Sequence, residues 1–255
     1  MAASIKTEKE IELIRESCVI VADVLKLVGV HIRPGVSTGE LDKLAEEYIR
    51  SCGAVPAFKG FGHDKHNLFP ATLCISIDSE VVHGIPGKRV LREGDIVSID
   101  VGAKKNGYFG DGAFTFAVGK VSEKKQRLMK ITQEALEKGV EQAVDGNRVG
   151  DIAHAVQTYV EAAGFSVVRD LVGHGVGREL HEEPSVPNFG KQKSGATLVE
   201  GMTLAIEPMV NAGTYKVHTA NDGWTILTYD AEPSAHFEHT VVVRKGKAEV
   251  LTQYS

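Results

Sequence analysis

The sequence predicts an α+β domain made of two similar halves, about 1–120 and 121–255, and two internal matches support this prediction. In the first match, residues 34–53 align without gaps with residues 145–164, and the identical pairs are Gly35/Gly146, Gly39/Gly150, Tyr48/Tyr159 and Gly53/Gly164. In the second, residues 91–100 align with residues 198–207, and each segment ends in an acidic residue. Both matches occur in the same order, a helix pair and then a strand. They therefore favour a duplication over chance reuse of glycine at helix ends, and a site is expected between the halves.

Helical periodicity predicts the outer elements of each half. Apolar residues recur every three or four positions between Ile11 and Val28, which is typical of a helix that buries one face. Ser37 is followed three residues later by Glu40, the pattern of a capping box at a helix start. The predicted helices cover residues 8–30, 37–53, 122–144 and 149–163.

Apolar runs between turn residues predict the strands. The clearest is a hairpin in which Asn106 and Gly107 form the turn between two long strands. Loops rich in Gly, Pro, Lys and Asn are expected over residues 53–71 and 184–197. The predicted strands cover residues 72–77, 80–84, 96–103, 108–118, 203–213, 224–229 and 236–243.

Composition restricts the class of protein. Of 255 residues, 42% are hydrophobic and 25% are charged, as in a globular domain. The formal net charge of −5 provides no basic footprint for nucleic acid, and no apolar run is long enough for a membrane span. Cys18, Cys52 and Cys74 are odd in number and widely spaced, which suits a reducing compartment. Because the first residues are too charged for a signal peptide, we expect a cytoplasmic single-domain protein, 1–255, without nucleic-acid or membrane partners.

Two carboxylates meet in the predicted hairpin. A loop centred before Asn106 places Asp100 directly opposite Asp111. A tight Asn106-Gly107 turn instead places the two acids one diagonal step apart on the same face. Buried like charges must protonate or find a counter-ion, whereas in an exposed hairpin both would be solvated. The glycines on either side of Asp111 would allow a β-bulge to aim its side chain.

Three further donors point to a metal centre. His174 lies in a GHGVG segment, Glu207 ends the duplicated strand, and Glu238 enters an otherwise apolar strand. Taken singly, each also fits a turn residue or an edge-strand acid. With the hairpin acids they make four carboxylates and an imidazole, which suit two divalent first-row ions better than a structural zinc. Such ions would offset the carboxylates, activate a water molecule and polarise a carbonyl.

Short motifs are spread over nearly the whole chain: VVHGIP (81–86), VSIDV (97–101), GDGA (110–113), GHGVGR (173–178), HEEP (181–184), AIEP (205–208) and EHTVV (238–242). In this combination the chain resembles the type I methionine aminopeptidases in their short bacterial form. The resemblance implies the pita-bread fold of creatinase and the aminopeptidases, an antiparallel sheet flanked by helices in pseudo-two-fold related halves. It also implies hydrolytic removal of the initiator methionine from nascent proteins and peptides with a small second residue.

The resemblance assigns roles residue by residue. Glu207 corresponds to the proton acceptor from the attacking water, and His83 to the histidine that helps proton transfer to the leaving group. His181 corresponds to the histidine that hydrogen-bonds the scissile carbonyl. Without the resemblance, both histidines would fit satisfied loop residues. The implied cofactor is a pair of divalent ions, Co, Mn, Fe, Zn or Ni, with ligands Asp100, Asp111, His174, Glu207 and Glu238, of which Asp111 and Glu238 bridge.

The methionine pocket is expected to be apolar, with room for one unbranched thioether chain. By the same resemblance its wall comprises Phe58, Phe61, Phe69, Cys74, Leu180 and Trp224. Phe58 stands where cysteine is common in the family, and Leu180 where an aromatic residue is usual. Segment 62–68 is longer than usual, so the shape of the pocket is expected to differ. Trp224 also fits an ordinary core aromatic.

Other interpretations keep the fold and change the activity. Aminopeptidase P, prolidase and creatinase carry, as families, an extra N-terminal domain that 255 residues are not expected to hold. Type II methionine aminopeptidases carry a long insertion between the last two acids, whereas Glu207 and Glu238 are only 31 positions apart. A structural metal site would not need His83 and His181 beside an apolar pocket, and a binding protein typically loses ligands that are present here. A peptidase of another N-terminal specificity stays open. We expect a monomer that acts on peptide and nascent-chain N-termini, with a transient ribosome contact.

Overall fold

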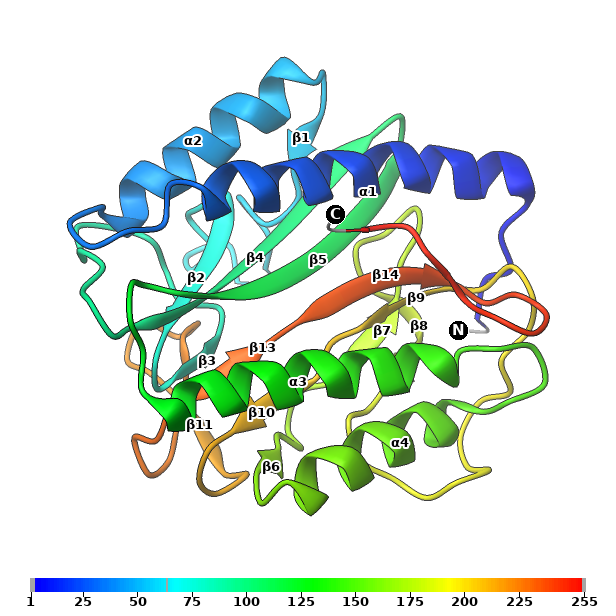
Figure 1. The fold of residues 1–255 in the computed structure, drawn as a ribbon. Helices are drawn as coiled ribbons and strands as arrows, with labels where there is room; N and C mark the ends of the chain where they lie inside the picture. Colours follow the sequence, from blue (N-terminus) through cyan, green and yellow to red (C-terminus); the bar gives the residue numbers. More distant parts are fainter. Residues whose placement is uncertain (1–2, 63, 254–255) are drawn as a thin grey trace.

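The computed structural model describes residues 3–62 and 64–253, in which four helices frame a set of strands (Figure 1). These four helices confirm the predicted ones, and the third, α3 (Glu123–Glu141), ends just before its predicted end near residue 144. None of the helices described has the length and apolar character that crossing a membrane requires. The helices are α1 (Glu8–Gly29), α2 (Thr38–Ser51), α3 (Glu123–Glu141) and α4 (Val149–Ala162).

Side-chain caps explain where the helices begin. The Ser37 hydroxyl accepts from the N–H of Glu40, and the Glu40 carboxylate accepts from the N–H of Ser37, so the predicted capping box is present. Thr7 and Glu10 form the same box at α1. Each box satisfies two N–H groups that the first turn of a helix leaves without a partner.

The strands form three sheets, and every pairing between them is antiparallel. The largest has the order β1-β4-β5-β14-β9-β7-β8, with β2 also pairing with β4 and β15 with β14. The smaller sheets have the orders β13-β10-β6 and β11-β12-β3. The strands are β1 (Val55–Pro56), β2 (Leu73–Ile77), β3 (Glu80–Val82), β4 (Ile96–Lys105), β5 (Tyr108–Ala117), β6 (Ser166–Val167), β7 (Gly173–Gly175), β8 (Glu182–Val186), β9 (Thr203–Ile206), β10 (Met209–Asn211), β11 (Val217–Thr219), β12 (Ile226–Thr228), β13 (Ser234–His236), β14 (Glu238–Val242) and β15 (Glu249–Val250).

Two predicted strands are each divided in the structure. The strand predicted over 203–213 ends at β9 and resumes as β10, because Pro208 between them has no N–H to donate to a ladder. The strand predicted over 236–243 begins as β13 in one sheet and continues as β14 in another. Strands of two to five residues within or beside the predicted loops, such as β1 and β8, were too short to give a periodic pattern.

The β4–β5 hairpin adopts the tight register. Asp100 pairs with Ala113, and Asp111 lies one diagonal step away opposite Gly102. The β-bulge that the glycines on either side of Asp111 would allow does not form, because the ladder is continuous along both strands. The glycine before Asp111 serves packing instead: a Cβ on Gly110 would lie 2.6 Å from the backbone nitrogen of Cys18 in α1.

One apolar core lies under each helix pair. The first packs α1 and α2 against β2 and β4, and the second packs α3 and α4 against β9 and β14. Phe114 of β5 packs against both cores. Figure 1 shows the same division, with α1 across β4 and β5 and α3 beside β10 and β13. Burial of each large apolar side chain contributes about 1.5–3 kcal/mol relative to exposure.

The halves repeat each other's hydrogen bonds. The N–H of Gly35 donates to the carbonyl of Leu91 over 2.9 Å, and the N–H of Gly146 donates to that of Leu198 over 3.0 Å. Because these residues are aligned pairs of the two internal matches, the backbone frame is duplicated as the sequence predicts. A second repeated pair is the hydrogen bond from Tyr48 Oη to Asp23 Oδ2 at 3.0 Å and from Tyr159 Oη to Glu134 Oε2 at 2.8 Å.

The duplication extends to the strands that return from β4 and β9. The N–H of Val118 donates to the carbonyl of Asp95 over 2.9 Å, and the N–H of Val243 donates to that of Met202 over 2.8 Å. Asp95 and Met202 are aligned in the second internal match. The strand that ends before Val118 is therefore equivalent to the one that ends before Val243.

Candidate active site and metal centre

Acidic and histidine side chains from both halves converge. Ligand atoms of Asp111, His174 and Glu238 all lie within 4.8 Å of one another. Asp111 is on β5, His174 on β7 and Glu238 on β14, which are strands of the largest sheet. The fold thus brings together three residues that the sequence predicts as metal ligands.

Asp100 and Glu207 lie beside these three. Asp100 on β4 pairs with Ala113, which pairs on its other side with Glu238 of β14. Glu207 follows β9, and its Oε1 lies 3.6 Å from Nε2 of His174. All five predicted ligands line one cavity of about 100 Å³.

The buried acids of this cluster must either hold protons or bind cations. Oδ1 of Asp100 and Oε1 of Glu238 are buried and have no hydrogen-bond partner among the described residues. Burial raises the pKa of Asp100 to about 7 and that of Glu207 to about 8. Burial, followed by the charge of neighbouring acids, raises the pKa of Asp111 and of Glu238 well above their usual values. Buried carboxylates must be paired or protonated, so these residues fit divalent cations that accept oxygen ligands.

His174 is oriented to offer one nitrogen to the cluster. Its Nδ1 lies 2.9 Å from the carbonyl oxygen of Gly175, which fixes the proton on Nδ1. The lone pair of Nε2 then faces the acids, 3.6 Å from Glu207 and 4.0 Å from Oδ2 of Asp111. Burial lowers the pKa of His174 to about 3, so this imidazole is neutral, as a metal ligand must be.

His83 and His181 stand at the edge of the cluster. Both line the 100 Å³ cavity, and the His181 and His174 rings are 4.3 Å apart in an edge-to-face arrangement. Burial lowers the pKa of His83 to about 4 and also lowers the pKa of His181. Each ring is therefore neutral near pH 7 and has one N–H donor and one acceptor nitrogen.

A close backbone approach places His83. A Cβ on Gly84 would lie 2.2 Å from the carbonyl oxygen of Ile75, so only glycine fits there. The N–H of Ile75 donates to the carbonyl of Gly84 over 2.8 Å. His83 itself has a φ of 60°, a left-handed conformation that is costly for a side chain of this size and common at functional sites.

The residues predicted to form the methionine pocket line the same cavity as the acids. Phe69 and Trp224 meet edge to face with ring centroids 5.3 Å apart, and Phe61 meets the His181 ring in the same way at 5.1 Å. Cys74 pairs with Asp100 across β2 and β4, so the apolar wall begins directly beside an acid. The six residues that the structure brings together here are Phe58, Phe61, Phe69, Cys74, Leu180 and Trp224.

Segment 62–68 supports the pocket wall. Nε1 of Trp224 donates to the carbonyl of Asn67 over 3.1 Å, and the amide of Asn67 donates to the carbonyl of Asp222 over 3.3 Å. Trp224 is therefore held by segment 62–68 as well as by the chain that leads from it into β12. Residue 63 lies outside the described residues.

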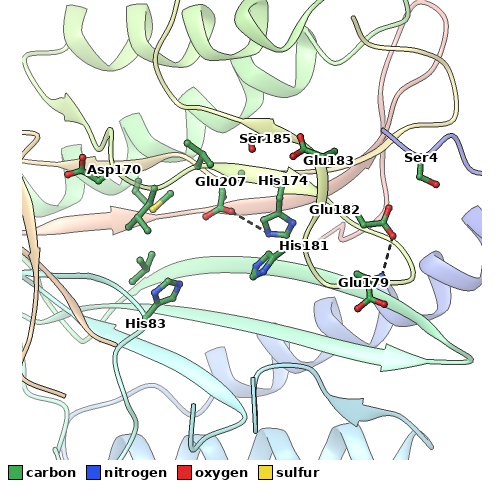
Figure 2. Close-up of a pocket in the computed structure, with 15 residues that line it drawn as sticks. Ser4, His83, Asp170, His174, Glu179, His181, Glu182, Glu183, Ser185 and Glu207 are labelled. Atoms are coloured by element: carbon green, nitrogen blue, oxygen red, sulfur yellow. Dashed lines mark hydrogen bonds and ion pairs between the residues drawn. The ribbon is translucent and has the colours of Figure 1, made fainter. Parts of the chain in front are cut away.

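A larger cavity of about 690 Å³ opens from the same residues (Figure 2). It shares His83, His174, His181 and Glu207 with the smaller cavity and continues past Asp170 and Glu183. These shared residues therefore stand between an apolar pocket and an open groove.

His236 is a buried residue near the site that sequence reasoning missed. Its Nε2 lies 3.6 Å from Oε2 of Glu207, and its side chain is 1% exposed. In the sequence it is one of two histidines beside Glu238 and has no spacing that singles it out. Extending the repeat into the returning strands would have found it, because that alignment equates His236 with Asp111.

Comparison with known proteins gives consistent matches. Residues 12–245 match the family described as Metallopeptidase family M24. A protein named methionine aminopeptidase from Clostridium acetobutylicum is 51% identical over 97% of this chain and 98% of its own. A crystal structure of methionine aminopeptidase from Thermotoga maritima has a TM-score of 0.95 and 45% identity, covering 99% of this chain and 100% of its own. The prolidase from Pyrococcus furiosus has a TM-score of 0.80 and 26% identity, covering 98% of this chain and 66% of its own.

Proposed function

The chain belongs to metallopeptidase family M24 and, within it, to the methionine aminopeptidases, and from this premise we propose how its residues carry out the reaction. It is a metal-dependent exopeptidase that removes the N-terminal methionine of its substrates. The observation that carries the proposal is the convergence of buried carboxylates on one imidazole nitrogen, with two carboxylate oxygens unpartnered among the described residues. The residues that would hold two divalent ions are Asp100, Asp111, His174, Glu207 and Glu238, which all line one cavity.

When bound, a pair of divalent ions offsets the four carboxylates, acidifies a water molecule and polarises a carbonyl. Glu207 then acts on the proton: one of its carboxylate oxygens accepts it from the attacking water. The position of Glu207 supports this role, because its side chain lines both the small cavity with the other acids and the larger groove.

His181 and His83 act on the two sides of the scissile bond. A ring N–H of His181 donates to the carbonyl oxygen as negative charge develops there. His83 would stand near the substrate amine and relay to the leaving nitrogen the proton that Glu207 took from the water as the C–N bond breaks, so that both residues return to their starting state. Their position between the apolar pocket and the groove supports these roles, and so does the neutral state of both rings.

The apolar cavity sets the preference for methionine. Its aromatic and aliphatic walls favour an unbranched thioether, and Cys74 and Leu180 leave it free of fixed charge on that side. The second residue of the substrate lies where His83 and His181 approach, so a small side chain is favoured there.

The enzyme is proposed to work as a single polypeptide. Residues 1–255 act as one catalytic domain with halves about 1–120 and 121–255, as a monomer in the cytoplasm. Its substrates are peptide and nascent-chain N-termini, met in a transient ribosome contact. The free state of Cys18, Cys52 and Cys74 supports a reducing compartment.

Release of free methionine from a Met-Ala-Ser peptide tests this function. The metal-free protein is assayed alone, with Mn²⁺ and with Co²⁺, and a Leu-Ala-Ser peptide serves as the matched control. We expect release only with metal and faster release of methionine than of leucine. Metal-independent release, or faster release of leucine, would contradict the proposal.

A further inference from the structure

His236 is a buried imidazole that none of the roles above uses. Only 1% of its surface is exposed, and neither ring nitrogen has a hydrogen-bond partner among the described residues. A buried polar group without a partner loses the hydrogen bonds that it would make with water, so its retention needs a reason. The ring also lines neither cavity of the site, so a bound substrate does not account for it.

The duplication gives His236 a counterpart. Asp111 pairs with Gly102 on the strand that follows Asp100, and His236 pairs with Met209 on the strand that follows Glu207. The two residues thus occupy the same place in the two halves. One is an acid that the site uses, and the other is an imidazole with no assigned partner.

Two equivalent threonines hold these two residues in the same way. Thr240 Oγ1 donates to the carbonyl of Asp111 over 2.7 Å and accepts from its N–H over 3.2 Å. Thr115 Oγ1 donates to the carbonyl of His236 over 2.7 Å and accepts from its N–H over 3.0 Å. In each case a threonine of one half binds the backbone of a residue in the other half. The backbone of His236 is therefore held by the same two hydrogen bonds as that of Asp111, a predicted metal ligand.

The ring of His236 faces Glu207. Its Nε2 lies 3.6 Å from Oε2 of Glu207, while Oε1 of the same carboxylate lies 3.6 Å from Nε2 of His174. Glu207 therefore has an imidazole beside each oxygen. At 3.6 Å neither contact is yet a hydrogen bond, and His236 Nε2 and Glu207 Oε2 must approach by about 0.4 Å to come within the usual range for N–H···O.

We propose that His236 is a positioning residue whose Nε2–H donates a hydrogen bond to Oε2 of Glu207 and fixes the orientation of that carboxylate. The inference rests on the proposed role of Glu207 as ligand and proton acceptor. Groups that orient a metal-binding carboxylate change both metal affinity and turnover when they are lost. Loss of His236 is therefore expected to act on both.

Three substitutions of His236, which differ in whether an N–H group can reach Glu207, test the proposed hydrogen bond. His236→Leu removes it within a similar volume, and His236→Asn keeps an amide that is too short to reach Glu207. His236→Gln keeps an N–H near the position of Nε2. His239→Leu is the matched control, because this neighbouring histidine of β14 contacts Thr252 through Nδ1 and lines neither cavity.

Two quantities are measured for each folded variant: Mn²⁺ binding to the metal-free protein by calorimetry, and kcat and KM for methionine release. We expect His236→Leu and His236→Asn to lower Mn²⁺ affinity and kcat by about 10–100-fold with little change in KM, as for other groups behind a metal ligand. His236→Gln is expected to restore most of both, and His239→Leu to match the wild type in both.

Two results would overturn the inference. Wild-type affinity and kcat in His236→Leu or His236→Asn would leave His236 as packing alone. Equal losses in the Gln and Asn variants would show that an N–H at this position is not what matters. Failure of the proposed function is a separate outcome, since the wild-type protein itself would then bind no Mn²⁺ or release no methionine.

Discussion

The two halves of the molecule repeat each other in their helices and in the hydrogen bonds around them, which we call the frame. They differ in the side chains of their inner strands, which are β4 and β5 in one half and β9, β13 and β14 in the other. In the frame, the hydrogen bonds from Gly35 to Leu91 and from Gly146 to Leu198 differ in length by only 0.1 Å, at 2.9 and 3.0 Å. On the inner strands, equivalent positions carry an acid and an imidazole at Asp111 and His236. Ala113 and Glu238 are likewise equivalent to each other, and they carry a methyl group and a carboxylate.

This difference indicates how a duplicated fold makes an asymmetric site. The repeated frame fixes the backbone of the equivalent strand pairs β4–β5 and β9–β14, so a change of side chain on these strands alters the chemistry and leaves the backbone geometry in place. Inner positions should therefore control metal binding and catalysis, and frame positions should control stability alone.

Removal of one inner carboxylate should have the largest effect. Asp100→Asn or Glu238→Gln takes away both a ligand and part of the charge that bound cations offset. We expect Mn²⁺ binding and methionine release to fall to background, measured by calorimetry and by the Met-Ala-Ser assay. Glu40→Gln is the matched acid-to-amide change in the frame and should leave both intact. Full activity in either inner variant would break the comparison.

Loss of His181 should affect turnover without affecting the ions. Because its N–H is proposed to act only on developing charge, His181→Ala should lower kcat by about 100-fold with KM and bound Mn²⁺ unchanged. The exposed His218 provides the control substitution, His218→Ala, for which no change in kcat is expected. If His181→Ala instead lost mainly Mn²⁺, the residue would belong with the ligands.

The stability of the metal-free protein should fall as pH rises from 6.5 to about 8. Burial raises the pKa of Asp100 to about 7 and of Glu207 to about 8, so the folded chain holds protons that the unfolded chain has already released. Unfolding is then favoured by rising pH. The buried histidines have lowered pKa values and act in the opposite direction, but only below their ordinary value of 6.5.

Urea midpoints of the metal-free and Mn²⁺-loaded protein at both ends of this range measure the effect. The metal-free midpoint should fall with pH, and the loaded midpoint should not, because metal binding needs ionised carboxylates and strengthens as they lose protons. A metal-free midpoint that rose over the same range would contradict the assignment of the buried acids.

The smallest effect should come from the frame. Tyr48→Phe and Tyr159→Phe each remove one hydrogen bond to an acid, which should lower the free energy of unfolding by about 1 kcal/mol. Because the two pairs are equivalent, the losses should be similar and kcat unchanged. Urea denaturation and the methionine assay measure both quantities. Unequal losses would show that the frames are less alike than their hydrogen bonds.

Local signals made the frame predictable. Capping residues, apolar spacing and glycine stops predicted the four helices. Asn106-Gly107 predicted the turn of the hairpin that holds Asp100 and Asp111 but left two registers open, of which the structure has the tight one. Strands such as β7 and β8 were missed because three to five residues carry too little pattern. The division of the strand at Pro208 depends on tertiary pairing as well as on the missing N–H.

The site was predictable as a set of residue types and not as a geometry. Acids placed in apolar strands at Asp100, Asp111 and Glu238 conflict with burial, and that conflict is visible in the sequence. The family resemblance supplied the roles of His83 and His181, which spacing alone could not. Sequence reasoning did not single out His236, because its equivalence to Asp111 is visible only once the strands of the two halves have been matched.

An anomalous difference map from a crystal of the Mn²⁺-loaded protein tests the central claim most directly. We expect two peaks where the halves meet, in contact with Asp100, Asp111, His174, Glu207 and Glu238, with Asp111 and Glu238 shared between them. A single peak held by one half, or peaks away from these residues, would contradict it.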